Sequence, residues 1–261
     1  MTTAELAAYI GAAAWLPQIA AWTYRLFVRP KITIVPDRYA EVGFTSNGPI
    51  FNIRMAFASD RKDAIIDGFE LIVRHADGDA RTFRWSGIRE DFSEITDAAG
   101  NRQGVISRDQ NPIALKIGTE SLVEKFVRFQ EPRYHETDRP SLLSLITQFN
   151  FLKRNETEYV SKTLASKELF ELLETRRTAF WWKAGRYDLT IKLSSPRKFR
   201  LTQSHFACSL TSTDIDHLRE NVEALTTDIQ NVINSNLPDF QEQPLNWNWA
   251  SVNIQKISAR N

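Results

Sequence analysis

The sequence predicts a mainly β protein of the α+β class, with a hydrophobic helix at its N-terminus, a helical insertion and a C-terminal helix. Three observations support this class. Many short segments alternate apolar and polar residues with a period of two, which is typical of half-buried strands. Two longer segments, about 138–180 and about 212–234, carry apolar residues at helical spacing. An uncharged stretch precedes both, so we expect an N-terminal helix within residues 1–30 and a β body over residues 31–261.

The uncharged stretch covers residues 6–24 and is bounded by Glu5 and Arg25. At a rise of about 1.5 Å per residue, a helix of this length just crosses the hydrocarbon core of a bilayer. Aromatic residues gather at its C-terminal end, where the headgroup region would begin. The sequence therefore predicts a membrane anchor, with the membrane as a partner. The predicted anchor residues are Leu6, Ile10, Trp15, Leu16, Ile19, Trp22, Tyr24, Arg25 and Arg29.

Lysine and arginine residues at positions 25–31 follow this stretch, whereas Glu5 precedes it. The positive-inside rule then predicts a single-pass protein with its body in the cytoplasm. Pro17 and Gln18 lie at the centre of the stretch and lower its hydrophobicity. Three alternatives remain open: a cleaved signal peptide that releases an exported or soluble body, a helix that lies in the membrane interface or docks on a partner, and an ordinary buried helix.

Strand signals begin directly after Pro30 and recur along the chain. Asp77 and Gly78 supply the residues of a tight turn between two such segments, which predicts a hairpin. Residues 89–110 are polar and turn-rich, so we expect an excursion at one end of the sheets. The expected strands are residues 31–35, 49–59, 64–74, 81–85, 113–117 and 122–129.

The helical insertion opens at Asp138, with Pro140 near its first turn. The C-terminal helix begins at Ser212 or Thr213 as the N-cap and carries a stripe of apolar residues. That stripe suits packing on the body or contact with a partner, and both interpretations remain open. After this helix, alternation within residues 245–249 predicts a last strand.

Strands also resume at residues 184–193, and the run Ala-Gly-Arg-Tyr-Asp-Leu at 184–189 resembles the approach to a late strand in immunoglobulin-like β-sandwiches. The resemblance covers the region of Gly185–Leu193 and implies a sandwich body. It also implies that the hydroxyl of Tyr187 bonds to backbone a few residues upstream. The paired cysteines of that family are absent, because Cys208 is the single cysteine, so the resemblance concerns architecture and carries no function.

The composition excludes several kinds of chemistry. A net charge of +1 gives no general field for a polyanion, so no nucleic acid is expected as a partner. The ten glycines form no phosphate-binding loop, and the four histidines, His75, His135, His205 and His217, lack metal-ligand spacing. We therefore expect no cofactor, no metal and no catalytic residue. Cys208 shares its parity with Phe206 and Leu210, which predicts a buried thiol.

One acidic segment and one mixed segment remain as candidate sites. Carboxylates at residues 90–97 offer ligands for a hard cation, or part of an enzyme site scattered in sequence, although a solvated loop is the simpler interpretation. The segment 176–183 combines aromatic residues with cations, as a partner-binding patch would. Alternatively, Phe180 and one tryptophan enter the core. The candidate contact residues are Arg176, Arg177, Trp181, Trp182 and Lys183.

The sequence therefore predicts a membrane-tethered, non-enzymatic interaction, scaffold or sensor protein that binds a protein partner. Two alternatives are kept: an exported or soluble binding domain, and an enzyme with a site near residues 90–97. Because almost no linker separates the first helix from the first strand at Pro30, we expect recognition at the far loops or on the inserted helices.

Overall fold

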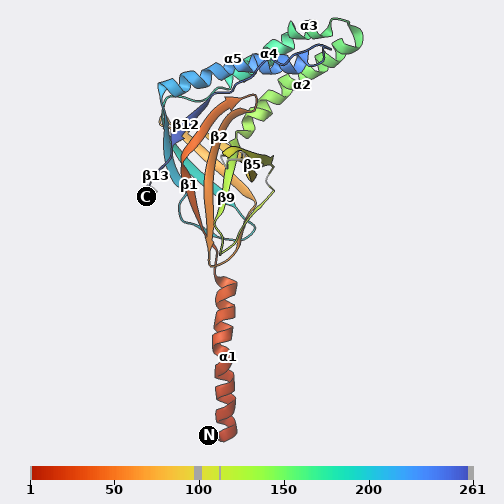
Figure 1. Cartoon of the computed structure of the whole chain (residues 1–261). Coiled ribbons are helices and arrows are strands. Elements are labelled where there is room, and N and C mark those ends of the chain that lie inside the picture. The colour runs from red at the N-terminus through yellow and green to blue at the C-terminus, as the bar shows by residue number, and fades with distance from the viewer. Residues whose placement is uncertain (1, 97–101, 112, 258–261) are drawn as a thin grey trace.

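The computed structural model describes residues 2–96, 102–111 and 113–257. About 39% of the protein is strand and about 35% is helix, so the fold is a mixture of the two with more helix than a mainly β chain would have. Figure 1 shows three parts in succession: a single N-terminal helix, a curled sheet, and a group of helices at the opposite end of the sheet. The predicted combination of a β body, an inserted helical segment and terminal helices is confirmed at this level.

The first helix, α1, covers Thr3–Phe27 and points away from the sheet (Figure 1). Among the residues that the structure describes, none of the helices combines the length and the apolar character needed to cross a membrane. Although α1 has 25 residues, its alanines together with Pro17, Gln18 and Thr23 leave it too weakly apolar. The predicted single-pass span, and the membrane location with a cytoplasmic body that rested on it, are therefore wrong.

The strands form one 11-stranded sheet in the order β10-β1-β2-β8-β5-β4-β9-β11-β13, with β12 paired to β1 and β6 paired to β5. Two short strands, β3 and β7, form a separate two-stranded sheet. The strands are β1 (Lys31–Thr45), β2 (Gly48–Asp60), β3 (Ala64–Ile66), β4 (Gly68–His75), β5 (Ala80–Thr96), β6 (Arg102–Gln110), β7 (Leu115–Ile117), β8 (Val123–Gln130), β9 (Gly185–Ser194), β10 (Arg200–Leu201), β11 (His205–Leu210), β12 (Trp249–Asn253) and β13 (Gln255–Lys256).

The C-terminal segment joins the two ends of this strand order. Strand β12 pairs antiparallel with β1, and two residues later β13 pairs antiparallel with β11. Between them, the backbone N–H of Ile254 donates to the carbonyl of Arg38 over 2.7 Å. The sheet therefore curls until β1 and β11 are connected by one segment, which contains β12 and β13. One continuous curled sheet does not confirm the two facing sheets of an immunoglobulin-like sandwich.

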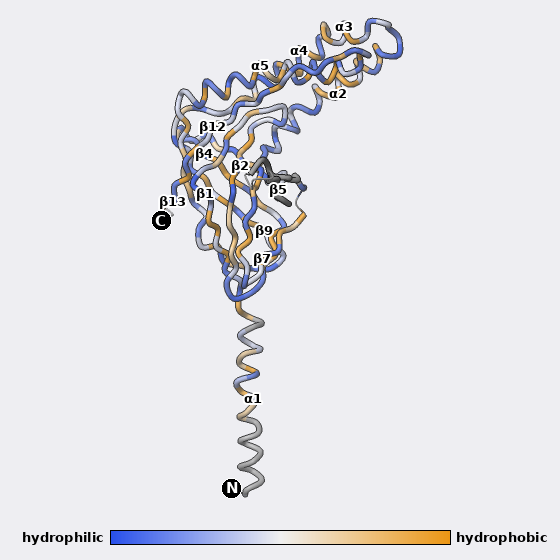
Figure 2. Tube along the Cα trace, viewed as in Figure 1, coloured by the Kyte–Doolittle hydropathy of each residue, from blue (hydrophilic) through white to orange (hydrophobic). Residues whose placement is uncertain are grey.

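The curl encloses the core, because alternate residues of each strand point inward. The inward residues form one continuous apolar cluster that includes Phe51, Met55, Phe69, Phe83 and Phe129. Apolar and hydrophilic residues alternate along the strands in Figure 2, as period two requires. The polar stretch 89–110 differs from expectation, because it forms the end of β5 and strand β6 rather than an irregular excursion.

The remaining helices are α2 (Pro132–Asn155), α3 (Tyr159–Leu164), α4 (Lys167–Thr178) and α5 (Ser212–Asn234). They lie together at the end of the sheet opposite α1 and extend to one side (Figure 1), and we call them the helical arm. The predicted bounds of the C-terminal helix match α5. Its N-cap is Thr211, one residue earlier than predicted, and a capping box with Asp214 fixes that start.

Candidate functional site

The helical arm begins at Glu131, a buried residue at the end of β8. Its carboxylate accepts a hydrogen bond from Nη1 of Arg81 on β5 over 2.7 Å. The guanidinium of Arg81 also lies 5.1 Å from the ring centre of Trp181. These contacts fasten the first residues of α2 to the sheet.

A buried ion pair holds α2 and α4 together. Nε and Nη2 of Arg176 donate to the two carboxylate oxygens of Asp138 over 2.8 and 3.2 Å, and the two side chains are only 6% and 8% exposed. Burial disfavours the charged guanidinium and is the largest single influence on its pKa, but the hydrogen bonds that Asp138 accepts, together with attraction to Tyr134, Asp138 and Asp228, raise the pKa of Arg176 overall. Because both ends of this pair are satisfied, α2 and α4 have one fixed antiparallel register.

The chain returns from the arm to the sheet through Trp181 and Trp182, which are 4% and 2% exposed. Nε1 of Trp182 donates to the carbonyl of Gly43 over 2.9 Å, and Nε1 of Trp181 donates to a carboxylate oxygen of Asp79 over 2.6 Å. Both indoles pack near the ring of Phe83. The two tryptophans therefore fill the end of the curled sheet. Their contacts set the direction of α4, which comes just before them in the chain.

Tyr187 makes the backbone contacts expected from the sequence. Its hydroxyl donates to the carbonyl of Lys183 over 2.8 Å and accepts from the backbone N–H of the same residue over 2.7 Å. Burial raises the pKa of Tyr187 to about 12, and the hydrogen bond with Lys183 offsets part of that rise. The predicted tyrosine hydrogen bond is confirmed, although it occurs in a curled sheet.

The ammonium of Lys183 lies 2.8 Å from a carboxylate oxygen of Asp77 in the β4–β5 turn. Hydrogen bonds from Lys183, from the backbone of Asp79 and from His75 hold the pKa of Asp77 well below its usual range. Since Asp77 and Lys183 are both about half exposed, this pair orders a surface turn and contributes little to the free energy of unfolding.

The five residues of the predicted contact patch thus lie close together, but most of their side chains are buried. Arg176, Trp181 and Trp182 are buried, whereas Arg177 is exposed and pairs with Glu174 over 2.9 Å. Both indoles fill the space that opens where helix returns to sheet, so the two tryptophans present little exposed aromatic surface. The interpretation in which aromatics of this segment enter the core describes the structure better.

The structure describes no reactive constellation around the arm. A hollow of about 370 Å³ lies beside it, and of its four charged residues Arg81 pairs with Glu131, Asp79 accepts a hydrogen bond from Trp181, and Arg133 is the fourth. Within the described residues, no group of three or more His, Cys, Asp or Glu side chains is placed to hold a metal ion. Cys208 is buried as predicted, and burial raises the pKa of its thiol to about 12. The side chains of the acidic segment 90–97 lie outside the described part of the structure.

Exposed apolar side chains of α2 and α4 form the candidate site. Leu143 and Ile146 of α2 are 51% and 44% exposed, and Phe170 of α4 is 62% exposed. The contacts Asp138–Arg176 and Ser141–Thr175 set an antiparallel register that places Ile146 level with Phe170. We call Leu143, Ile146 and Phe170 the arm face.

The apolar pattern of α2 includes residues of the arm face. The buried side of α2 follows Leu145 and Leu152, with the partly buried Leu142 and Phe149 at the same helical spacing. Leu143 and Ile146 lie one position after members of that stripe, so a second apolar row runs beside the first.

The predicted anchor residues of α1 that the structure describes do not contact the sheet. Trp15, Leu16, Ile19, Trp22 and Tyr24 are all exposed, and Arg29 is an exposed residue where α1 meets the sheet. The side chains of Leu6, Ile10 and Arg25 lie outside the described part.

The chain matches no protein-family model, no curated protein and no solved structure.

Proposed function

We propose that the protein is a non-enzymatic binding protein that docks a protein partner on the arm face. The observation that supports this proposal is the exposure of Leu143, Ile146 and Phe170 on a helix pair whose register is fixed by a buried ion pair. In this proposal the β body supports the arm that binds the partner, and the protein acts as a binding domain without a membrane-spanning helix.

The physical argument is preorganisation. Exposed apolar side chains on a mobile element would lose conformational entropy on binding, which weakens affinity. Here the arm is held by the ion pairs Arg176–Asp138 and Arg81–Glu131 and by the packing of the two tryptophans. Little further conformational entropy is therefore lost when a partner binds. Aromatic and large aliphatic residues on such a rigid surface are the usual centres of binding energy in protein interfaces.

Affinity capture with the full-length chain tests this function. The arm-face variant combines Leu143→Ser, Ile146→Ser and Phe170→Ser. The matched control combines Tyr39→Ser with Leu122→Ser, which removes similarly exposed apolar side chains from the sheet and its loops. We expect a partner to be recovered with the wild type and the control, and to be lost with the arm-face variant.

Thermal unfolding of all three proteins must accompany the capture, because exposed residues should change the midpoint only slightly. Recovery of the same partners by the arm-face variant and by the wild type would contradict the proposal. A wild-type chain that recovers nothing beyond the arm-face variant would contradict it as well.

A further inference from the structure

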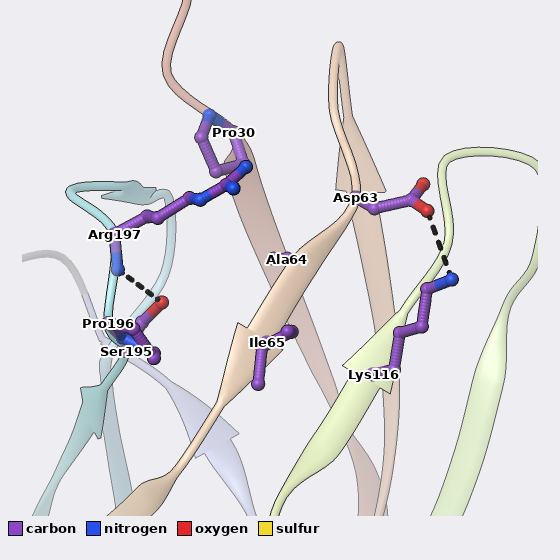
Figure 3. A pocket seen from close by; sticks show the side chains of 8 residues that line it. All are labelled: Pro30, Asp63, Ala64, Ile65, Lys116, Ser195, Pro196 and Arg197. Carbon is purple, nitrogen blue, oxygen red and sulfur yellow. Dashed lines mark hydrogen bonds and ion pairs between the residues drawn. The ribbon is translucent and has the colours of Figure 1, made fainter.

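The end of the sheet opposite the arm is hollowed where α1 meets β1. Three adjoining hollows of about 160, 560 and 500 Å³ lie there, and Arg197 of the β9–β10 loop lines all of them. Figure 3 shows the smallest, with the loop of Ser195 and Arg197 on one side, Asp63 and Ile65 on the other, and Pro30 above. The two larger hollows are wide and open to solvent, so they suit contact with an exposed charged group.

Four cations around these hollows have no ion-pair partner among the residues that the structure describes. They are Arg29, Lys62, Arg197 and Lys198, which together line the hollow of about 500 Å³. The two carboxylates nearby are engaged elsewhere, because Asp60 pairs with Lys31 over 3.7 Å and Asp63 with Lys116 over 3.5 Å. The Asp63 side chain points toward Lys116 and away from Arg197 (Figure 3). A chain with a net charge of +1 thus concentrates positive charge at one end.

Backbone contacts hold the segments that carry these cations on both sides of the hollow. Strand β10 pairs in parallel with the start of β1, and the N–H of Arg200 donates to the carbonyl of Pro30 over 2.9 Å. The N–H of Arg197 donates to Oγ of Ser195 over 3.3 Å. The loop that carries Arg197 and Lys198 is therefore held against the chain that carries Arg29.

On the opposite wall, Oγ of Ser59 donates to the carbonyl of Lys62 over 2.6 Å and closes the β2–β3 turn. Arg61, in that turn, has a φ of 77° and is the one non-glycine residue with positive φ among the described residues. Such a backbone costs free energy for a side-chain-bearing residue, and strained turns concentrate at binding sites. The turn keeps a strained conformation that brings Lys62 to the hollow.

We infer that this junction binds a phosphate group. Two guanidinium groups, from Arg29 and Arg197, supply paired N–H donors that match phosphate oxygens, and Lys62 and Lys198 add two point charges. Without an anion the four cations repel one another, and a phosphate removes that repulsion. The shared chemistry is a phosphate-bearing anion, whose source is either a free phosphorylated molecule or the headgroup of an anionic lipid.

The test uses the full chain and two probes. Calorimetric titration with inorganic phosphate measures the free anion. Flotation with phosphatidylcholine vesicles that contain phosphatidic acid, compared with phosphatidylcholine alone, measures the lipid headgroup. The site variant is Arg29→Gln/Arg197→Gln, and the control is Arg74→Gln/Lys192→Gln, which removes the same charge from exposed positions on β4 and β9.

We expect the wild type and the control to bind at least one probe, and the site variant to bind that probe roughly tenfold or more weakly. Added salt should weaken the wild-type interaction, since the contact is electrostatic. Phosphate binding identifies a free ligand, and binding only to vesicles with phosphatidic acid identifies a headgroup.

A second site variant, Lys62→Gln/Lys198→Gln, tests the same site if the first variant fails to fold. It should show the same loss with an unchanged thermal midpoint. Failure of the wild type to bind either probe would overturn the inference, as would equal losses in the site variant and the control. None of these results depends on the arm face.

Discussion

The Asp138–Arg176 pair shows how much one side chain can contribute to the position of the arm. Replacing Asp138 with Ala leaves the Arg176 guanidinium buried without its partner. Breaking a buried pair in this way costs about 3–5 kcal/mol of unfolding free energy. Chemical denaturation should show that loss. The control is Glu174→Ala, which breaks the exposed pair with Arg177 and should cost less than about 1 kcal/mol. Equal losses in both variants would show that the buried pair has no special role.

Cys208 and Tyr187 make the stability of the protein sensitive to alkaline pH. Burial raises the pKa of each to about 12, from ordinary values of 9.0 and 10.0. Above pH 9 the unfolded chain releases these protons first, so the unfolding free energy should be level below about pH 9 and fall toward pH 12.

Unfolding titrations between pH 7 and pH 12 measure this decline. In Cys208→Ala the fall should begin nearer pH 10, where the unfolded-state tyrosine starts to ionise. A decline that begins at the same pH in both proteins would rule out the thiol as its source.

Arg61 carries a cost that a glycine would remove. At a φ of 77°, Arg61→Gly should raise the unfolding free energy by up to about 1 kcal/mol, after the greater flexibility of glycine in the unfolded chain is subtracted. Arg61→Ala removes the same charge but keeps the positive φ, so it should give no gain. Comparison of the two thermal midpoints separates backbone strain from charge.

Single residues were predicted best where a local rule applies. The hydroxyl contacts of Tyr187 and the burial of Cys208 followed from strand parity and a short motif. Two interpretations stayed open for Trp181 and Trp182, because whether an aromatic cluster faces solvent or packs into the end of a sheet depends on the residues that lie across from it. The eight residues of the segment 176–183 do not by themselves show which residues will lie across from the two tryptophans.

At the scale of elements, the contact of α2 with the β1–β2 hairpin can be tested with two glycines. Gly48 has a φ of 79°, and an added Cβ would overlap the ring of Tyr134 at the start of α2. Gly78 has a φ of 97° but nothing lies within 4 Å of an added Cβ.

Both substitutions to alanine incur strain of about 1–2 kcal/mol. Gly48→Ala should lose about 1–3 kcal/mol more, because the Tyr134 ring has to move. Thermal unfolding of the two variants isolates this packing contribution. If Gly48→Ala is no less stable than Gly78→Ala, the hairpin does not support the arm.

The elements themselves were predicted from their periodicity with uneven success. The bounds of α5 could be predicted from its apolar stripe, because the capping box at its start and the regular apolar row follow each other directly in the sequence. The ends of β5 and strand β6 were missed because polar residues carry no alternation, and their pairing comes from a neighbouring strand. The arm face was missed because exposure is decided by which of two apolar rows packs against α3 and α4.

At the scale of the whole molecule, the two ends of the chain differ in their contribution to stability. The described side chains of α1 from residue 13 to residue 24 are exposed, whereas β12 and β13 connect β1 with β11. Deleting residues 1–27 should leave the thermal midpoint of the remainder almost unchanged. Deleting residues 249–261 should abolish cooperative unfolding, because two strands lose their neighbour. Circular dichroism of both truncated chains measures this contrast.

The global fold was predictable only in outline. Composition and periodicity indicated a mixture of sheet and helix with an insertion, but the curl depends on pairings between residues more than 200 positions apart. The prediction of a membrane span was right about the length of α1 and wrong about its hydrophobicity. Its alanines lower the average apolar character below what crossing a membrane needs.

The bridging role of β12 also sets the order of events when the chain is made. Strand β1 leaves the ribosome early, and its partner Ala250 follows more than 200 residues later. At about 5–20 residues per second, that interval is on the order of 10–40 s. Throughout it, one side of β1 presents unpaired backbone groups, which invite pairing with other chains. Newly made copies are therefore more open to such pairing than the finished protein is.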